Sequence, residues 1–303
     1  MISLAMPTYN GGEFLREQLD SIYGQTLLPD EVIVVDDCST DNTIEILEEY
    51  KAKYGLIYIK NEKNLGYNKN FEKAISLCSG DYIVLSDQDD IWLPSKIEKC
   101  YNVIKDVDVN TPSLVSCFSS TNKNILAKRK ETACGIIGTW KHNLSCYTSQ
   151  GCTLMFNRKL LEFIIPFHDG IMYDAYIGFI ASLLGNRFYI GEQLMYYRIH
   201  INNSFATGKL SIIERFRSNL SQTVPGWYTM ERFKILTIIR DKYMNLISAE
   251  KYNYLDRILQ LYETSNLKRL WLFNSIREIS IRQKLKTSVL LIFKIIFNIE
   301  NKS

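Results

Sequence analysis

The chain lacks the spaced cysteine and histidine patterns of a structural metal site. It holds seven cysteines and three histidines, but no CxxC pair and no histidine cluster. This absence argues against a zinc-bound fold, and the odd number of cysteines argues against a disulfide framework. We therefore expect reduced thiols and a cytoplasmic location. The first residues, MISLAMPTYN, lack the charged segment and long apolar run of a signal peptide, so we expect none.

Three nucleotide-binding signatures are also missing. A dinucleotide dehydrogenase would carry GxGxxG after its first strand, and a P-loop enzyme would carry GxxxxGK[ST]. Neither pattern occurs. A sugar nucleotidyltransferase would place a basic, glycine-rich loop there, whereas the stretch MPTYNGG contains no Lys or Arg. These three enzyme classes are disfavoured.

No apolar run is long enough to cross a bilayer. Residues 285–299 are rich in Ile, Leu and Phe, but lysines interrupt them. This stretch fits an interfacial helix, a helix docked on the protein's own helices, or a partner-binding segment.

Charge is unevenly divided along the chain. Residues 1–206 hold 19 Lys and Arg against 25 Asp and Glu, whereas residues 207–303 hold 17 against 8. The basic tail can attract anionic lipid or nucleic acid, or can form a solvated helical face.

The first part of the chain alternates strand and helix patterns. With 303 residues and 46% hydrophobic content, the chain can bury one large core or two. Short β-branched runs predict buried strands, and amphipathic stretches between them predict helices. The alternation indicates a parallel α/β sheet with right-handed crossovers. The predicted strands are Ile2–Met6, Val32–Val35, Ile57–Ile59 and Tyr82–Leu85, and the predicted helices are Gly12–Gln25, Ser39–Tyr54 and Asn68–Cys78.

Beyond residue 110 the pattern loosens, and we expect variable loops until about residue 150. A helix is expected from Asp174 to Leu184, and a last strand at Gly191–Arg198. From residue 210 onward only helices are expected, near 210–221, 228–247, 250–263 and 266–282.

Polar and acidic residues follow three of the predicted strands. They are Pro7-Thr8-Tyr9-Asn10, Asp36-Asp37-Cys38-Ser39 and Ser86-Asp87-Gln88-Asp89-Asp90. In a parallel sheet these segments meet at the carboxyl edge, where ligands bind. Helix capping explains part of the second segment. The carboxylates of the third would repel one another unless a cation or a ligand compensated them.

Taken together in order, five segments resemble family-2 glycosyltransferases. They are Pro7–Gly11, Val34–Asp41, Asn64–Gly66, Gly80–Tyr82 and Asp87–Trp92. Later matches around Gly151, Asp174 and Arg198 extend the resemblance to about residue 205. The motif DQDDIW, residues 87–92, resembles the corresponding motif of bacterial rhamnosyltransferases of polysaccharide biosynthesis. The resemblance implies a GT-A fold, meaning a Rossmann-like, mostly parallel sheet flanked by helices. It implies a domain over 1–206, with a nucleotide-sugar half (1–110) and an acceptor half (111–206). Residues 207–303 would then be a helical appendage.

The resemblance also implies roles for the strand-end residues. An inverting enzyme moving a sugar, such as L-rhamnose from its dTDP form, to a glycan acceptor would need Mg²⁺ or Mn²⁺ at the leaving diphosphate. Asp89 is the implied metal ligand. The implied donor-binding residues are Pro7, Thr8, Tyr9, Asn10, Asp37, Lys69, Asp87 and Gln88. A plain surface role for Lys69 stays open.

The general base is expected to be Asp174. Asp169 is the rival, but Gly170 beside it suggests a turn. Arg198 and His200 are candidates for contacting diphosphate or metal, and a local loop role for His200 stays open. The expected partners are a nucleotide-sugar donor and a glycan or lipid-linked glycan acceptor, at the inner face of the plasma membrane, with no nucleic acid. The alternative is a catalytically inactive scaffold that binds nucleotide sugar.

Overall fold

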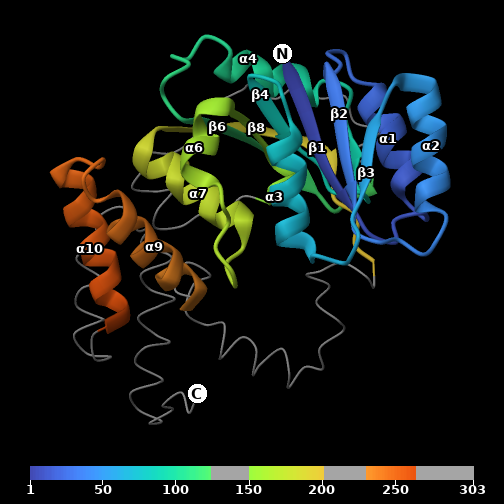
Figure 1. The fold of residues 1–303 in the computed structure, drawn as a ribbon. Coiled ribbons are helices and arrows are strands. Elements are labelled where there is room, and N and C mark those ends of the chain that lie inside the picture. Colours follow the sequence, from blue (N-terminus) through green and yellow to red (C-terminus); the bar gives the residue numbers. More distant parts are fainter. Residues whose placement is uncertain (124–149, 201–229, 264–303) are drawn as a thin grey trace. The chain divides into compact units, whose positions relative to one another are not determined.

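A computed structural model describes residues 1–123, 150–200 and 230–263. Within these ranges one eight-stranded sheet has the order β3-β2-β1-β4-β7-β6-β8-β5 (Figure 1). Its strands are β1 (Ile2–Thr8), β2 (Glu31–Asp36), β3 (Ile57–Lys60), β4 (Tyr82–Leu85), β5 (Ile91–Trp92), β6 (Ser113–Ser120), β7 (Leu154–Asn157) and β8 (Asn186–Tyr196).

The first four strands pair in parallel, as the sequence predicts. β1 lies between β2 and β4, and β3 pairs with β2. The connecting helices are α1 (Leu15–Tyr23), α2 (Thr43–Tyr54) and α3 (Tyr67–Leu77). The helix α2 begins four residues later than expected because Ser39 donates from both its backbone N–H and its hydroxyl to Asp36. These bonds hold the segment after β2 in a turn.

Helices cover both faces of the sheet. Alternate residues of β1, including Leu4 and Met6, join one buried cluster with apolar residues of α1, α2 and α4 (Lys96–Ile104). On the opposite face α3 lies against β1 and β2, and Figure 1 shows α3 in front of these strands. This two-sided cover explains why the strands read as continuous apolar runs.

The second half of the sheet is mixed in direction. β7 is antiparallel to β4 and to β6, and β8 is parallel to β6 and antiparallel to β5. The expectation of loops directly after residue 110 is wrong for Ser113–Ser120. That serine-rich segment is an interior strand, hydrogen-bonded on both sides, and its pairing with β7 and β8 outweighs its weak local pattern. The last strand also begins earlier than expected, at Asn186.

Short helical segments and one long helix complete this half. They are η2 (Gly151–Thr153), η3 (Arg158–Leu160), α6 (Leu161–Ile164) and α7 (Tyr173–Leu184). The helix expected from Asp174 to Leu184 is therefore confirmed. Ten of the twelve residues of α7 are buried.

The chain divides into two compact units, Met1–Ile137 with Ser149–His200, and Gly138–Thr148 with Ile201–Ser303. In the second unit the structure describes α9 (Met230–Tyr243) and α10 (Ala249–Glu263). They confirm the helices expected near 228–247 and 250–263. The helices expected at 210–221 and 266–282, and the stretch 285–299, lie outside the described residues. None of the described helices is long and apolar enough to span a membrane.

Candidate active site

The carboxyl ends of β1 and β2 are joined by buried polar contacts. Thr8 donates from its hydroxyl to Asp36 over 3.1 Å, and both residues are buried. Asn10 has a positive φ of 47°, and its side-chain oxygen accepts from the backbone N–H of Thr40 at 2.8 Å. These bonds hold the loop after β1 next to the loop after β2.

Gln88 connects the loop after β4 to the loop after β1. Its side-chain oxygen accepts from the N–H of Tyr9 at 2.9 Å, and its side-chain nitrogen donates to the carbonyl of Tyr9 at 3.1 Å. A Cβ on Gly11 would lie 2.3 Å from the same amide oxygen. The ring of Tyr9 itself is half exposed. Gln88 therefore orients the loop that presents Tyr9.

Asp37 is buried and holds the turn before α3. One carboxylate oxygen accepts from Asn61 at 2.8 Å and from the N–H of Leu65 at 2.7 Å. The other accepts from the N–H of Gly66 at 2.9 Å. Gly66 has a φ of 80°, a region that favours glycine. Asp37 thus fixes the backbone of the Asn64-Leu65-Gly66 turn.

Replacing Asp37 with Ala should destabilise the protein. The change leaves three buried or half-buried donors without their acceptor, so we expect the free energy of unfolding to fall by about 2–3 kcal/mol. Urea unfolding followed by circular dichroism measures this. Asp81→Ala is the control, because it removes only an exposed ion pair with the amino terminus and should change stability by less than about 1 kcal/mol. Equal effects of the two substitutions would contradict the structural role of Asp37.

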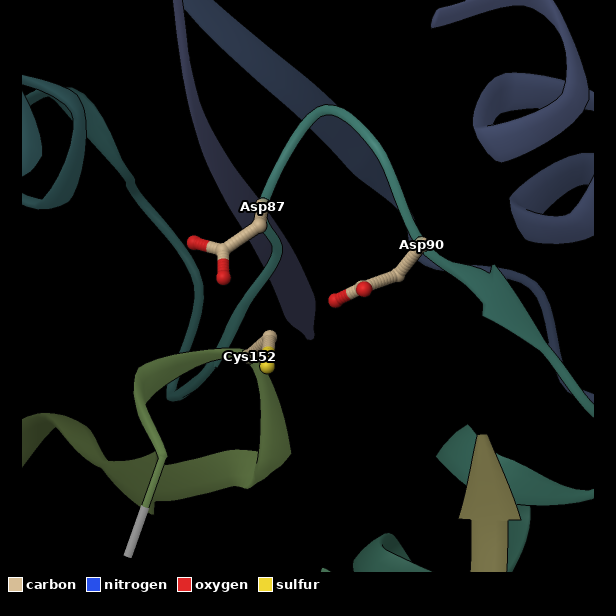
Figure 2. A group of neighbouring side chains, drawn as sticks. All are labelled: Asp87, Asp90 and Cys152. Atoms are coloured by element: carbon tan, nitrogen blue, oxygen red, sulfur yellow. The ribbon is translucent and has the colours of Figure 1, made fainter. Parts of the chain in front are cut away.

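Asp87, Asp90 and Cys152 form a cluster beside the loop after β4. One potential ligand atom from each residue lies within 4.8 Å of the others. Figure 2 shows the two aspartates on opposite sides of the loop, with the sulfur of Cys152 next to them. Asp90 and Cys152 are buried, and Asp87 is partly buried. One oxygen of Asp90, Oδ2, is buried without a hydrogen-bond partner among the described residues.

Burial and mutual repulsion perturb the acids of this cluster. Burial, reinforced by the charge of Asp89, raises the pKa of Asp90 to about 7. Burial and the charges of Asp90 and Asp89 hold the pKa of Asp87 well above its ordinary value. Burial and the charges of Asp90 and Asp87 raise the pKa of the Cys152 thiol. Strongly shifted carboxyl groups at a ligand-binding edge are typical of functional sites.

Lys96 lies buried under this cluster. Its Nζ donates to the carbonyl of Cys152 at 2.6 Å and lies 3.1 Å from the centre of the Trp92 ring. Burial lowers the pKa of Lys96, and the neighbouring thiols, Cys117 first, together with Asp90 oppose that shift. Sequence reasoning missed Lys96, Asp90 and Cys152 as members of the site. Asp90 belongs to the acidic run that the sequence displays, but nothing in the sequence alone indicates that Lys96 lies beneath it.

The carboxylate of Asp89, on the same loop, contacts the segment that follows β8. Its Oδ2 lies 2.7 Å from Nε2 of His200. Arg198 donates from Nε to the carbonyl of Asp89 at 2.8 Å and pairs with Glu17 at 2.6 Å. The backbone N–H of Arg198 also reaches Asp90 at 3.2 Å. The structure therefore brings Arg198 and His200 onto the acidic loop.

Asp174 lies in the first turn of α7 and is partly buried. Its Oδ1 accepts from the N–H of Ala175 at 2.7 Å. The charge of Asp174 contributes to the raised pKa of Asp87. Burial, followed by the charges of Asp87 and Asp174, raises the pKa of Tyr173 well above its ordinary value. Asp174 is therefore within electrostatic reach of the acidic loop.

Lys69 and Asp169 lie apart from this arrangement. Lys69 pairs with Glu72 at 3.0 Å and donates to the carbonyl of Phe167 at 3.2 Å. The carboxylate of Asp169, whose side chain is 94% exposed, lies 3.9 Å from the same ammonium group. Pro7 is partly buried in β1 and makes no side-chain hydrogen bond. The described contacts of Lys69 thus run to the segment before α7.

The sheet order, the helices on both faces and the acidic loop after β4 are those of the GT-A fold. Solved structures with the same fold include S. aureus TarS 1-349 in complex with UDP-GlcNAc, with a TM-score of 0.62 and 17% identity over 99% of this chain and 93% of that one. Another is the mannosyltransferase PcManGT from Pyrobaculum calidifontis, in complex with GDP-Man and Mn²⁺, with a TM-score of 0.56, 17% identity and coverage of 100% and 88%.

The family is shown by sequence. The family model described as "Glycosyl transferase family 2" matches residues 3–186. The dTDP-rhamnosyl transferase RfbG of Shigella flexneri is 30% identical over 78% of this chain and 85% of its own length. The glycosyltransferase GlyG of Streptococcus pneumoniae serotype 4 is 26% identical over 86% of this chain and 96% of its own. The chain belongs to glycosyl transferase family 2 and is a glycosyltransferase.

Proposed function

We propose that this enzyme transfers a sugar, with inversion, from a nucleotide-sugar donor to a glycan acceptor in cell-surface polysaccharide assembly. The observation that carries the proposal is the grouping of Asp87, Asp89 and Asp90 at the carboxyl edge of the sheet. Asp174 lies within electrostatic reach of Asp87. A leaving nucleoside diphosphate is strongly anionic, and an acidic site can hold it only together with a cation. The arrangement fits a donor site better than a site for a neutral ligand.

The residues of the acidic loop fit Mg²⁺ or Mn²⁺. Hard divalent cations prefer carboxylate oxygens, and the buried Oδ2 of Asp90 is an oxygen without a hydrogen-bond partner. The raised pKa of Cys152 keeps its sulfur protonated, so the thiol is a poor ligand for such a cation. We propose Asp89 as the direct ligand, with His200 beside it and Asp87 and Asp90 completing the acidic surroundings. When bound, the cation would neutralise charge on the leaving diphosphate.

We assign some residues to binding the donor and Asp174 to the role of general base. Pro7, Thr8, Tyr9, Asn10 and Gln88 would line the base and ribose side of the donor, with the half-exposed ring of Tyr9 available for stacking. Asp37 would contribute to donor binding indirectly, by holding the Asn64-Leu65-Gly66 turn in place. Asp87 would contact ribose or sugar, and Arg198 the diphosphate. The contacts of Lys69 with Glu72 and with the carbonyl of Phe167 favour a positioning role over direct phosphate binding.

In the transfer step the acceptor hydroxyl oxygen bonds to the anomeric carbon while its proton passes to the carboxylate of Asp174. The bond between that carbon and the diphosphate oxygen breaks on the opposite face, and the nucleoside diphosphate leaves with the bonding electrons. Asp174 suits this role better than Asp169, which is almost fully exposed and lies beside Lys69. One carboxylate base and one leaving group suffice for inversion.

The similarity to RfbG, which is described as a dTDP-rhamnosyl transferase, favours dTDP-L-rhamnose as the donor. We also propose that the enzyme is cytoplasmic and acts on a lipid-linked glycan at the inner face of the plasma membrane. Residues 207–303 hold 17 Lys and Arg against 8 Asp and Glu, and such a basic segment is attracted to anionic lipid. We do not expect a nucleic-acid partner, because the first 206 residues carry a net negative charge.

A thermal-shift panel tests the donor and the metal together. The protein would be titrated with dTDP-, UDP- and GDP-sugars, with and without Mn²⁺, and the series repeated with Asp89→Ala. We expect one nucleotide class to raise Tm only with Mn²⁺, and we expect Asp89→Ala to abolish that rise. Ligand at 100 times its Kd would stabilise the protein by about 2.7 kcal/mol. A shift without nucleoside diphosphate release would favour the inactive scaffold, and no shift with any donor would reject the proposal.

A further inference from the structure

One face of α3 holds the segment that precedes α7. The ring of Phe71 stacks on Tyr173 with centroids 4.2 Å apart, and the ring of Phe167 also stacks on Tyr173, at 5.8 Å. Phe71, Phe167 and Tyr173 are all buried. Tyr173 is the first residue of α7 and the neighbour of Asp174. The position of the proposed base therefore depends on α3, an element separated from it by about one hundred residues of sequence.

Asn68 makes the polar part of this contact. Its side-chain nitrogen donates to the carbonyl of Ile171 at 2.6 Å, and its side-chain oxygen accepts from the N–H of Tyr173 at 3.3 Å. The two partners define the orientation of the amide, because a carbonyl needs a donor and an N–H needs an acceptor. Tyr173 lies in the first turn of α7, where a backbone N–H has no acceptor within its own helix. Asn68 thus caps the helix that carries Asp174, from another helix.

A second anchor lies one turn further along α3. Glu72 accepts from the backbone N–H of Phe167 at 2.8 Å, and Lys69 donates to the carbonyl of the same residue at 3.2 Å. The side chains of Lys69 and Glu72 also pair with each other at 3.0 Å. The segment 167–173 is therefore tied to α3 at both of its ends. Such a segment has little freedom to shift the start of α7.

The amino-terminal end of α3 is fixed at the proposed donor pocket. The helix begins directly after Gly66, whose N–H is held by Asp37. The backbone N–H of Leu65 is held by the same carboxylate. One short stretch of chain, residues 65–68, thus joins Asp37 to the start of α7.

We propose that Asn68 is a positioning residue that aligns Asp174 with the donor, acting through the first turn of α7. The proposal rests on the proposed function, in which Asp174 is the base. Misplacing a reacting group by about 1 Å can cost about 100-fold in rate. Loss of both Asn68 bonds would shift the Asp174 carboxylate without removing it and without touching the residues proposed to bind the donor.

The test uses Asn68→Ala, Asn68→Asp and the matched control Ser76→Ala. Ser76 is exposed on the same helix, and its hydroxyl bonds only to the backbone of Glu72. Nucleoside diphosphate release from dTDP-L-rhamnose would be measured with p-nitrophenyl glycosides as acceptors, and donor affinity by thermal shift. We expect Asn68→Ala to lower kcat about 10- to 100-fold with donor affinity within about 2-fold of wild type. Asn68→Asp keeps the acceptor for Tyr173 and should lose less, and Ser76→Ala should behave as wild type.

A double substitution separates positioning from a general loss of structure. If Asn68 acts through Asp174, adding Asn68→Ala to Asp174→Asn should lower kcat by less than 2-fold further, because the group that it positions is already gone. A full additional loss in the double variant, or a kcat of Asn68→Ala equal to that of Ser76→Ala, would overturn the inference while leaving Asp174 as the base. A wild-type kcat for Asp174→Asn alone would overturn the base assignment and this inference with it.

Discussion

Asp174→Asn is expected to lower kcat by about 10²- to 10⁴-fold, the range that loss of a general base produces. The amide is nearly isosteric with the carboxyl group and can still accept from the N–H of Ala175, so the first turn of α7 should stay intact. It cannot take the proton of the acceptor hydroxyl. Steady-state nucleoside diphosphate release measures kcat, and a thermal shift with donor and Mn²⁺ should match that of the unaltered protein.

Asp169→Asn is the matched control for that result. Both residues are aspartates near the start of α7, but the side chain of Asp169 is exposed and its carboxylate lies beside Lys69. We expect its kcat to stay within about 2-fold of wild type, as for most exposed surface substitutions. The reverse pattern, with Asp169→Asn inactive and Asp174→Asn active, would exchange the two assignments.

Lys96→Met is expected to lower the free energy of unfolding by about 1–3 kcal/mol, the cost of leaving a buried hydrogen-bond acceptor without its donor. Lys96 is fully buried, its Nζ donates to the carbonyl of Cys152, and its charge acts on Asp90. Methionine fills a similar volume but leaves that carbonyl and the acidic cluster without a cation. Chemical denaturation measures the change.

Lys105→Met is the control for this second substitution. Lys105 is exposed just after the end of α4, so its replacement should change stability by less than about 0.5 kcal/mol. Added Mn²⁺ should restore part of the stability lost in Lys96→Met, because it would supply positive charge to the same carboxyl groups. If Lys96→Met were as stable as Lys105→Met, Lys96 would not be the cation that compensates Asp90.

The parallel half of the fold could be predicted because three of its strands, β1, β2 and β4, are buried on both faces, and the edge strand β3 keeps a short β-branched run. Such strands read as uninterrupted apolar runs, and the four predicted ones agree with β1 to β4. The meeting of the polar strand ends could also be predicted, because the carboxyl ends of parallel strands lie at one edge of the sheet. The contacts of Tyr9 with Gln88 and of Thr8 with Asp36 follow from that edge.

The strand β6 could not be predicted, because its serines carry no alternating pattern and its stability comes from pairing on both sides. Likewise, Lys96 under Asp90 and Asn68 at Tyr173 are contacts between elements, and local sequence contains no sign of them. The metal role of Asp89, the base role of Asp174 and the domain boundary near residue 206 stay predictions.

The two short strands on either side of the acidic loop have a mechanical consequence. β4, which leads into the loop, pairs with β1 and with β7, and β5, which leaves it, pairs with β8. Residues 86–90 therefore connect a strand in the middle of the sheet to a strand at its edge, because β7, β6 and β8 lie between β4 and β5. A displacement of β8 and β5 relative to β4 would thus move Asp90 relative to Asp87 while β1, β2 and β3 keep their pairing.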